Sequence, residues 1–122
     1  MHTIEMPAAY LKKWLEGLRS GKYKRGQRTL KTHDGKYCCL GVLQQVVDGD
    51  VERFDSGVTK GLPSLEWLKK HNIKFFSTVG DEYTPSVPYL PKLGTTASLA
   101  NDRLCCSFKQ IADAIEACAK PV

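Results

Sequence analysis

Hydrophobic side chains recur at helical spacing near the start of the chain. After Pro7, which suits the first turn of a helix, apolar residues follow a 3.6-residue repeat with charged residues between them. The apolar positions are Tyr10, Leu11, Trp14, Leu15 and Leu18. They predict an amphipathic helix over residues 7–19, which Ser20-Gly21 ends because glycine tolerates a left-handed cap.

A second amphipathic pattern lies near residue 107. Ser107 and Gln110 match a capping box, in which each side chain satisfies a free backbone amide at the other position. The apolar stripe that follows is Phe108, Ile111, Ala112, Ile115 and Cys118. This pattern predicts a helix that starts just after Ser107.

Three further helices are expected. The string CCLGVLQQVV, residues 38–47, is apolar on nearly every side, and its length and its Leu and Gln content favour a buried helix over a strand. Asp48-Gly49-Asp50 should end it. A short helix is expected over residues 62–70, and another from Thr95 or Thr96 through residue 100.

Strand signals are weaker. Residues 27–32 alternate weakly, His33-Asp34-Gly35 predicts a turn, and residues 36–38 return as a partner strand, which together predict a small hairpin. Residues 73–76 are expected to form an edge strand, and residues 51–61 are expected to be irregular or partly extended. Prolines 85, 88 and 91 predict a surface loop over residues 84–92.

These elements predict one α+β domain over residues 1–122, with three to five helices around a short antiparallel hairpin or sheet. The length of 122 residues, with 42% hydrophobic and 25% charged residues, is typical of one globular domain. The expected shared core is Trp14, Leu18, Leu40, Leu43, Trp67, Ile111 and Ile115. Neither a run of 18 apolar residues nor a signal-peptide pattern occurs, so we expect a cytoplasmic protein that does not bind membranes.

Positive charge is concentrated in residues 11–36. This segment holds nine basic and two acidic residues, a net charge of +7, whereas the rest of the chain carries −2. Such a local field attracts phosphates or acidic protein surfaces, although a solvated surface has the same composition.

Within that segment, residues 22–28 combine positive charge with groups that suit anion binding. Arginine offers a planar fork for phosphate, tyrosine can stack on a base, and Gly26 lets the backbone approach a ligand. The candidate anion-binding residues are Lys22, Tyr23, Lys24, Arg25, Arg28 and His33. His33 and Asp34 are neighbours, which seldom hold a base and its orienting acid correctly, so we predict no catalytic residues.

The five cysteines and the acidic residues have structural interpretations. Four cysteines form two adjacent pairs, and neighbouring side chains point apart, so neither pair easily chelates a metal ion. We expect reduced core cysteines, with no metal and no cofactor. The acidic residues Asp48, Asp50, Glu52 and Asp55 lack the EF-hand spacing and predict a solvated loop.

Three strings carry a resemblance to a known family: GLRSGKYKRG (residues 17–26), DGKYCCLGVL (34–43) and LANDRLCCSFKQIADAIE (99–116). They resemble a family of small tailed-bacteriophage proteins. Where that family shows a polar turn, this chain has the more apolar Leu104-Cys105-Cys106. The resemblance implies a phage gene expressed in the host bacterial cytosol, and small accessory phage proteins modify, block or evade host machinery. It implies no particular activity or site residue.

The function that these observations favour is a non-enzymatic binder that blocks or sequesters a host factor through a basic surface. The partner would be a host defence protein or a small nucleotide-type signal. A nucleic-acid-binding accessory protein is the alternative. A small hydrolase ranks third, because the sequence contains no phosphate loop, dinucleotide fingerprint or HExxH motif. Self-association of the chain stays open.

Overall fold

The chain combines short helices with strands of only two or three residues. The computed structural model describes residues 2–76 and 87–122. In chain order the elements are β1 (Ile4–Met6), α1 (Ala8–Arg19), α2 (Cys39–Asp48), α3 (Leu65–Lys70), β2 (Lys74–Phe75), β3 (Tyr89–Leu90), the 3₁₀ helix η1 (Pro91–Leu93), β4 (Thr95–Thr96), α4 (Ala97–Asp102), α5 (Phe108–Cys118) and β5 (Ala119–Pro121). Within the described residues, five α-helices and two small sheets confirm the predicted α+β domain.

The larger sheet has the order β2-β1-β5. Strand β1 is its centre, antiparallel to β2 and parallel to β5, with Ile4 opposite both Phe75 and Ala119. Strands β3 and β4 form a separate antiparallel pair. The expected edge strand at residues 73–76 is therefore confirmed as β2, whereas the sequence pattern had not indicated β1 or β5.

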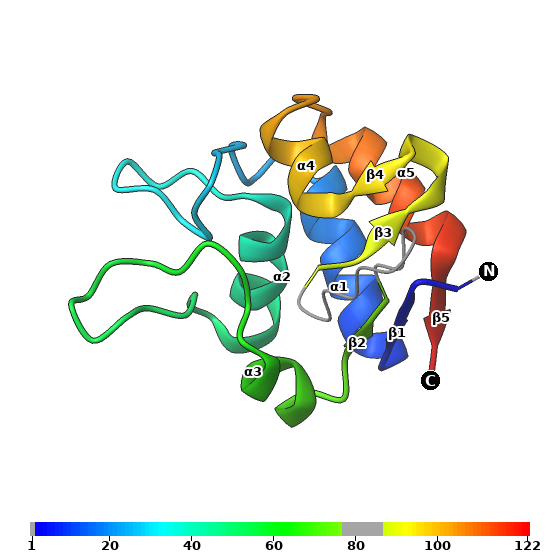
Figure 1. Ribbon diagram of the computed structural model, residues 1–122, viewed down its shortest axis with the longest axis horizontal. Coiled ribbons are helices and arrows are strands. Elements are labelled where there is room, and N and C mark those ends of the chain that lie inside the picture. The colour runs from blue at the N-terminus through cyan, green and yellow to red at the C-terminus, as the bar shows by residue number, and fades with distance from the viewer. Residues whose placement is uncertain (1, 77–86) are drawn as a thin grey trace.

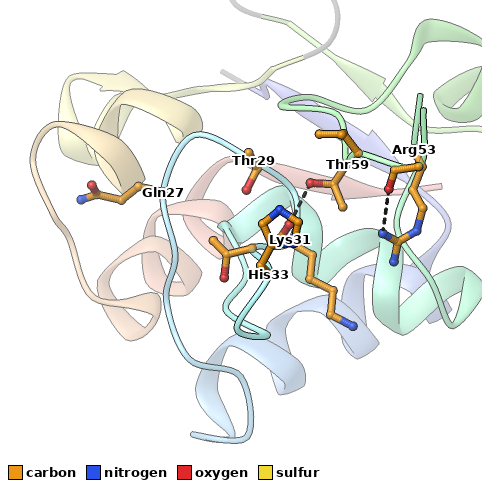
Figure 2. Close-up of a pocket in the computed structure, with 9 residues that line it drawn as sticks. Gln27, Thr29, Lys31, His33, Arg53 and Thr59 are labelled. Atoms are coloured by element: carbon orange, nitrogen blue, oxygen red, sulfur yellow. Dashed lines mark hydrogen bonds between the residues drawn. The ribbon is translucent and has the colours of Figure 1, made fainter. Parts of the chain in front are cut away.

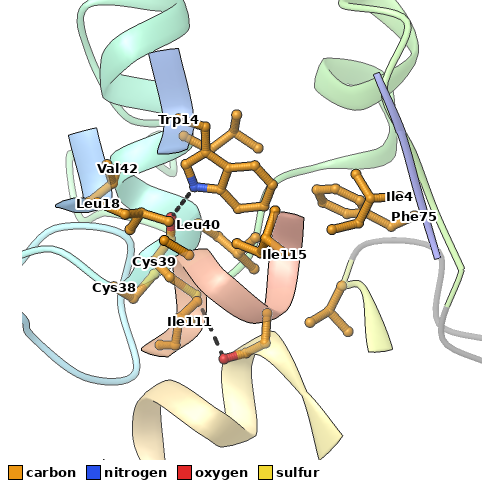
Figure 3. Close-up of a cluster of buried hydrophobic side chains, with 14 of the residues drawn as sticks. Ile4, Trp14, Leu18, Cys38, Cys39, Leu40, Val42, Phe75, Ile111 and Ile115 are labelled. Atoms are coloured by element: carbon orange, nitrogen blue, oxygen red, sulfur yellow. Dashed lines mark hydrogen bonds between the residues drawn. The ribbon is translucent and has the colours of Figure 1, made fainter. Parts of the chain in front are cut away.

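Helix α1 supplies the centre of the core, as its pattern predicted. Trp14 is fully buried, and its indole Nε1 donates a hydrogen bond to the Cys39 carbonyl oxygen at 2.9 Å (Figure 3). Its ring lies 6.2 Å from that of Phe75. Gly21 beyond the helix has φ +76°, the left-handed value expected there. Trp14 thus joins α1 to both α2 and the sheet.

Helix α2 confirms the buried helix that the apolar string predicted. Cys38 caps it, because its Sγ accepts a hydrogen bond from the Gly41 amide at 3.3 Å. Gly49, at φ +80°, ends it. A Cβ at Gly41 would overlap the Leu30 carbonyl oxygen and lie 2.7 Å from its carbonyl carbon. Only glycine permits this close approach of the loop to the helix.

Helix α5 confirms the capping box, with both hydrogen bonds between Ser107 and Gln110 present at 2.9 and 3.1 Å. The whole apolar stripe of this helix is buried. All seven residues predicted to share the core belong to one hydrophobic cluster. Thr96 caps α4 and Ser64 caps α3, so both short helices were also predicted correctly.

The hairpin predicted over residues 27–38 is present only around its turn. The turn at His33-Asp34 forms, Lys31 pairs antiparallel with Tyr37, and the Thr32 amide donates to the Lys36 carbonyl oxygen at 2.7 Å, but no regular strand spans residues 27–32 or 36–38. Arg28 adopts φ +68°, which interrupts an extended strand. Residues 51–61 are irregular and partly extended, as predicted, with one antiparallel bridge between Arg53 and Thr59.

The proline-rich stretch is only partly a loop. Tyr89 and Leu90 form β3, so the prediction of loop there is wrong, and Pro88 and Pro91 flank the strand rather than interrupt it. Positions 84–86 of that prediction lie outside the described residues.

Cysteine burial follows the prediction at three of five positions. Cys38, Cys39 and Cys118 are buried, whereas Cys105 is exposed and Cys106 is half-buried, and all five are free. Leu104 beside them is 58% exposed, so the chain between α4 and α5 stays at the surface despite its apolar residues.

Asp48, Asp50 and Asp55 of the acidic run are exposed, as predicted, whereas Glu52 is half-buried, which corrects the prediction there. Two members of the run also make structural contacts. Asp48 Oδ2 accepts a hydrogen bond from the Trp67 indole at 2.6 Å. Glu52 Oε1 accepts from the Gln44 amide at 2.6 Å and from the Ser64 backbone at 2.7 Å. These carboxylates tie the chain after α2 to that helix and to α3.

The helices and the larger sheet occupy one side of the molecule, and long irregular segments occupy the other. Figure 1 shows the strands β1 and β5 beyond α1, while the segments before and after α2 extend in the opposite direction. Among the described residues, no helix is long and apolar enough to cross a membrane.

Candidate functional site

Two irregular segments, residues 22–38 and 50–61, pack against each other beside α2, and we call them the loop lobe. The Leu30 amide donates to the Lys60 carbonyl oxygen at 2.7 Å, and Thr59 Oγ1 donates to the Lys31 carbonyl oxygen at 2.8 Å. Gly57, at φ +83°, permits the tight turn that folds the second segment back on itself. Segments far apart in sequence thereby form one surface.

A cavity of about 470 Å³ lies between the two segments, within the size range of small-molecule sites. We call it the cationic groove. Figure 2 shows Thr29, Lys31 and His33 projecting from one segment and Arg53 and Thr59 from the other, with Gln27 set apart. Its lining is Gln27, Thr29, Lys31, Thr32, His33, Arg53, Gly57, Val58 and Thr59.

The cations of the groove are held by local contacts. The Arg53 guanidinium lies 3.3 Å from Asp50 Oδ1 and 3.5 Å from the Gly57 carbonyl oxygen. The Lys31 ammonium lies 5.4 Å from the centre of the Tyr37 ring. The Val51 amide lowers the pKa of Asp50, and Arg53 and Lys31 lower it further, so this carboxylate stays charged. Two cations therefore share one carboxylate, which leaves the groove positive.

One hydroxyl in the groove lacks a partner. Thr29 Oγ1 is buried and makes no hydrogen bond within the described residues. The other threonines are engaged, since Thr32 Oγ1 bonds the Asp34 carboxylate and Thr59 bonds Lys31. A buried hydroxyl without a partner costs about 1–3 kcal/mol. The Thr29 oxygen is closed to solvent, so a ligand oxygen would recover that free energy only after the Thr29 side chain turns into the groove.

The residues predicted for anion binding do not form one site. His33 lines the cationic groove, whereas Lys22 and Tyr23 line a shallow hollow between α1 and α2. Lys22 lies 5.6 Å from the Tyr23 ring, which packs edge-on against Tyr37 at 5.2 Å. Lys24 is exposed on the loop lobe. Tyr23 thus serves mainly in packing within the lobe.

The two predicted arginines lie at the junction with α4. Arg25 Nη1 donates to the Asn101 carbonyl oxygen at 2.9 Å. The backbone amide of Arg28 donates to Asp102 Oδ1 at 3.1 Å, and its side chain is exposed. The contact to Asn101 occupies Arg25 in the structure, while Arg28 adds to the positive rim.

Asn101 fixes the base of the loop lobe. It is fully buried, accepts from the Cys39 amide at 3.3 Å and donates to the Gly26 carbonyl oxygen at 2.8 Å. A Cβ at Gly26 would lie 2.9 Å from Lys36 Cβ. Gly26 therefore allows close packing of the chain on itself, a different role from the ligand approach predicted for it.

The sequence interpretation missed Arg53 and Thr29. Arg53 lies outside the basic segment, and no local pattern connects it with Lys31. The hydrogen bond between Leu30 and Lys60 brings them to one groove, and such long-range pairing between irregular segments leaves no periodic signal. The one sequence signal for this groove was the density of basic residues around Lys31.

The neighbouring residues His33 and Asp34 are not arranged as a base with its orienting acid. Asp34 bonds Thr32 and lies 3.4 Å from the Lys36 ammonium, so it is turned to those groups instead of orienting His33. Within residues 2–76 and 87–122, no three His, Cys, Asp or Glu side chains gather in a way that would hold a metal ion. The groove offers cations and a hydroxyl, which suit binding of an anion.

Comparison with known proteins adds one match. A family model described as a domain of unknown function (DUF8296) matches residues 6–61, a range that contains all residues lining the cationic groove. No curated protein and no solved structure matches the chain significantly.

Proposed function

We propose that this chain is a non-enzymatic binding protein that holds a small phosphate-bearing anion, of nucleotide type, in the cationic groove. The observation that carries the proposal is the meeting of Lys31, Arg53 and the unpartnered Thr29 hydroxyl around one cavity of about 470 Å³. The Arg53 guanidinium can bond two phosphate oxygens at once, and Lys31 adds a point charge. Binding of this kind requires no covalent step.

Exposed cations outside the groove would support capture. Lys22, Lys24 and Arg28 are exposed on the loop lobe and extend the positive field around the groove. Such a field raises the rate at which an anion arrives more than it tightens the final complex. In this proposal, the basic residues of positions 22–28 therefore steer the anion towards the groove.

The resemblance to small phage proteins suggests the biological setting. We propose that the protein acts in the cytosol of a host bacterium as an accessory protein, and that it sequesters an anionic signal. A binder removes its ligand by mass action and needs only enough copies to exceed the ligand concentration. A host protein as partner, or a nucleic acid, would give different results in the test below.

The test is calorimetric titration of the purified chain with adenosine 5′-monophosphate, inorganic phosphate and a single-stranded oligonucleotide. Arg53→Ala should weaken nucleotide binding by about 10-fold or more, because a hydrogen bond to a charged group contributes about 1.5–3 kcal/mol. Asp50→Asn should tighten it, since the amide still accepts from Val51 but no longer competes for Arg53. Arg103→Ala, which removes an exposed arginine outside the groove, is the matched control.

Three outcomes would contradict the proposal. One is the absence of binding for both phosphate ligands. Another is an Arg53→Ala affinity equal to that of the wild type. The third is preferential binding of the oligonucleotide with a steep log-linear salt dependence, about −0.7 per phosphate neutralised on a single strand, which would indicate a nucleic-acid-binding protein.

A further inference from the structure

A buried glutamine of α2 is paired with the loop lobe. Gln44 has no exposed surface, and both polar atoms of its side chain bond the same residue, Glu52. Its Oε1 accepts from the Glu52 backbone amide at 2.8 Å, and its Nε2 donates to Glu52 Oε1 at 2.6 Å. A buried amide is costly unless its polar atoms are paired in this way. The two bonds hold the backbone and the side chain of Glu52 together, so they fix its orientation as well as its place.

Glu52 is the residue directly before Arg53, so its orientation decides where Arg53 points. The chain is extended at Arg53, which forms an antiparallel bridge with Thr59. Successive side chains of an extended segment point to opposite faces. Because the Glu52 side chain is turned towards Gln44, the Arg53 side chain is directed to the other face, where it lines the cationic groove together with Thr59 (Figure 2).

The same anchor reaches the opposite wall of the groove through the backbone. The Lys60 amide donates to the Glu52 carbonyl oxygen at 3.1 Å, and the Lys60 carbonyl oxygen accepts from the Leu30 amide at 2.7 Å. The Lys60 ammonium also lies 3.6 Å from Glu52 Oε2. Leu30 directly precedes Lys31, the cation of that wall. Hydrogen bonds therefore connect Gln44 to the backbone on both sides of the groove, next to each of its two cations.

We propose that Gln44 is a positioning residue for the cationic groove, and that it sets the place of Arg53 opposite Lys31. This inference rests on the proposed function and adds to it a residue that touches no ligand. A buried polar pair can fix one arrangement where an apolar side chain of the same size would permit several. Bonds from a guanidinium to phosphate are directional, so two cations that hold one phosphate need a fixed separation.

A double-mutant cycle on ligand affinity separates positioning from general stability. Gln44→Met keeps a side chain of similar length and removes both bonds to Glu52. Calorimetric titration with adenosine 5′-monophosphate should show binding about 3- to 10-fold weaker than that of the wild type. In the Arg53→Ala background the same substitution should weaken binding by less than about 2-fold, because the separation of two cations no longer matters once one is removed. A merely structural role would give the same loss in both backgrounds.

Gln110→Met is the matched control, because Gln110 accepts from the Ser107 amide at the start of α5. It should lower stability and keep the wild-type affinity. If Gln44→Met does not fold, Gln44→Asn, which keeps the amide but is one methylene shorter, takes its place in the same cycle. Wild-type affinity in the Gln44 variant, or an equal loss in both backgrounds, overturns the positioning role and leaves the phosphate site intact. Absence of binding by the wild type overturns the proposed function together with this inference.

Discussion

Replacing Gly41 by alanine tests how the loop lobe is attached to the helical core. Gly41 lies in α2, where alanine is intrinsically favoured over glycine by about 1 kcal/mol. Helix propensity alone therefore predicts a stabilised protein. The packing predicts the opposite, because the new Cβ would overlap the Leu30 carbonyl oxygen and lie 3.1 Å from its Cα.

The backbone of Leu30 has little freedom to move away. Leu30 is fully buried, its amide donates to Lys60 at 2.7 Å and its carbonyl oxygen accepts from Cys38 at 3.3 Å. Overpacking of a core costs about 1–3 kcal/mol, and each hydrogen bond lost costs about 1 kcal/mol more. After subtraction of the gain in propensity, Gly41→Ala should lower the free energy of unfolding by about 3 kcal/mol.

Urea unfolding followed by tryptophan fluorescence would measure this difference. Gly17→Ala is the matched control, since Gly17 lies inside α1 and its Cβ would meet the Val46 and Val42 side chains at 3.1 and 3.2 Å. Side-chain methyl groups can shift by a few tenths of an ångström, so this variant should stay within about 1 kcal/mol of wild type. A Gly41→Ala protein as stable as wild type would refute the argument that Leu30 is held rigidly against α2.

Three further predictions concern other contacts. Asn101→Ala should lower the free energy of unfolding by about 2–4 kcal/mol in thermal or urea unfolding, because it leaves buried backbone groups without partners; a loss below 1 kcal/mol would show that water replaces the amide. Burial raises the pKa of Glu52, but hydrogen bonds from Ser64 and Gln44 and the charge of Lys60 outweigh this and lower the pKa below 4.5, so Glu52→Gln should be less stable than wild type near neutral pH. That difference should shrink as the pH falls through the folded-state pKa, and a constant difference down to pH 3 would contradict it. Burial raises the pKa of Cys38 to about 11, so iodoacetamide should label Cys105 in the folded protein and Cys38 only after unfolding, as peptide mass analysis can check.

The helices could be predicted because their signals are local. The spacing of apolar residues, the capping box at Ser107 and the left-handed glycine at Gly49 each act within one or two helical turns. Such signals can be recognised directly in the sequence. Strand β1 could not be predicted in this way. Its three residues alternate apolar, charged and apolar, but a pattern of three residues is too short to indicate a strand. They become a strand because the helices bring the sheet partners around Phe75 and Ala119 to them.

The candidate site was predictable in its charge but not in its geometry. Net charge indicated the basic segment, and one of its candidate residues, His33, lines the groove. Arg25 shows what net charge leaves out, because charge does not reveal that its guanidinium donates to the Asn101 carbonyl oxygen. The partner of Lys31 across the groove depends on how two irregular segments pack, which is a tertiary effect without a sequence period.

The order of strands in the larger sheet has a consequence for the time course of folding. Strand β1 is made early by the ribosome, yet its parallel partner β5 spans residues 119–121. Contacts so distant in sequence must overcome a large loop-closure entropy, and they slow folding relative to the local contacts of helices. We expect the helical core to form first and the sheet to close late, so that substitutions at Ile4 mainly speed unfolding. During synthesis, the apolar strand Ile4–Met6 therefore stays without its parallel neighbour until residue 121 has emerged, and for that interval it is open to proteolysis and to pairing with other chains.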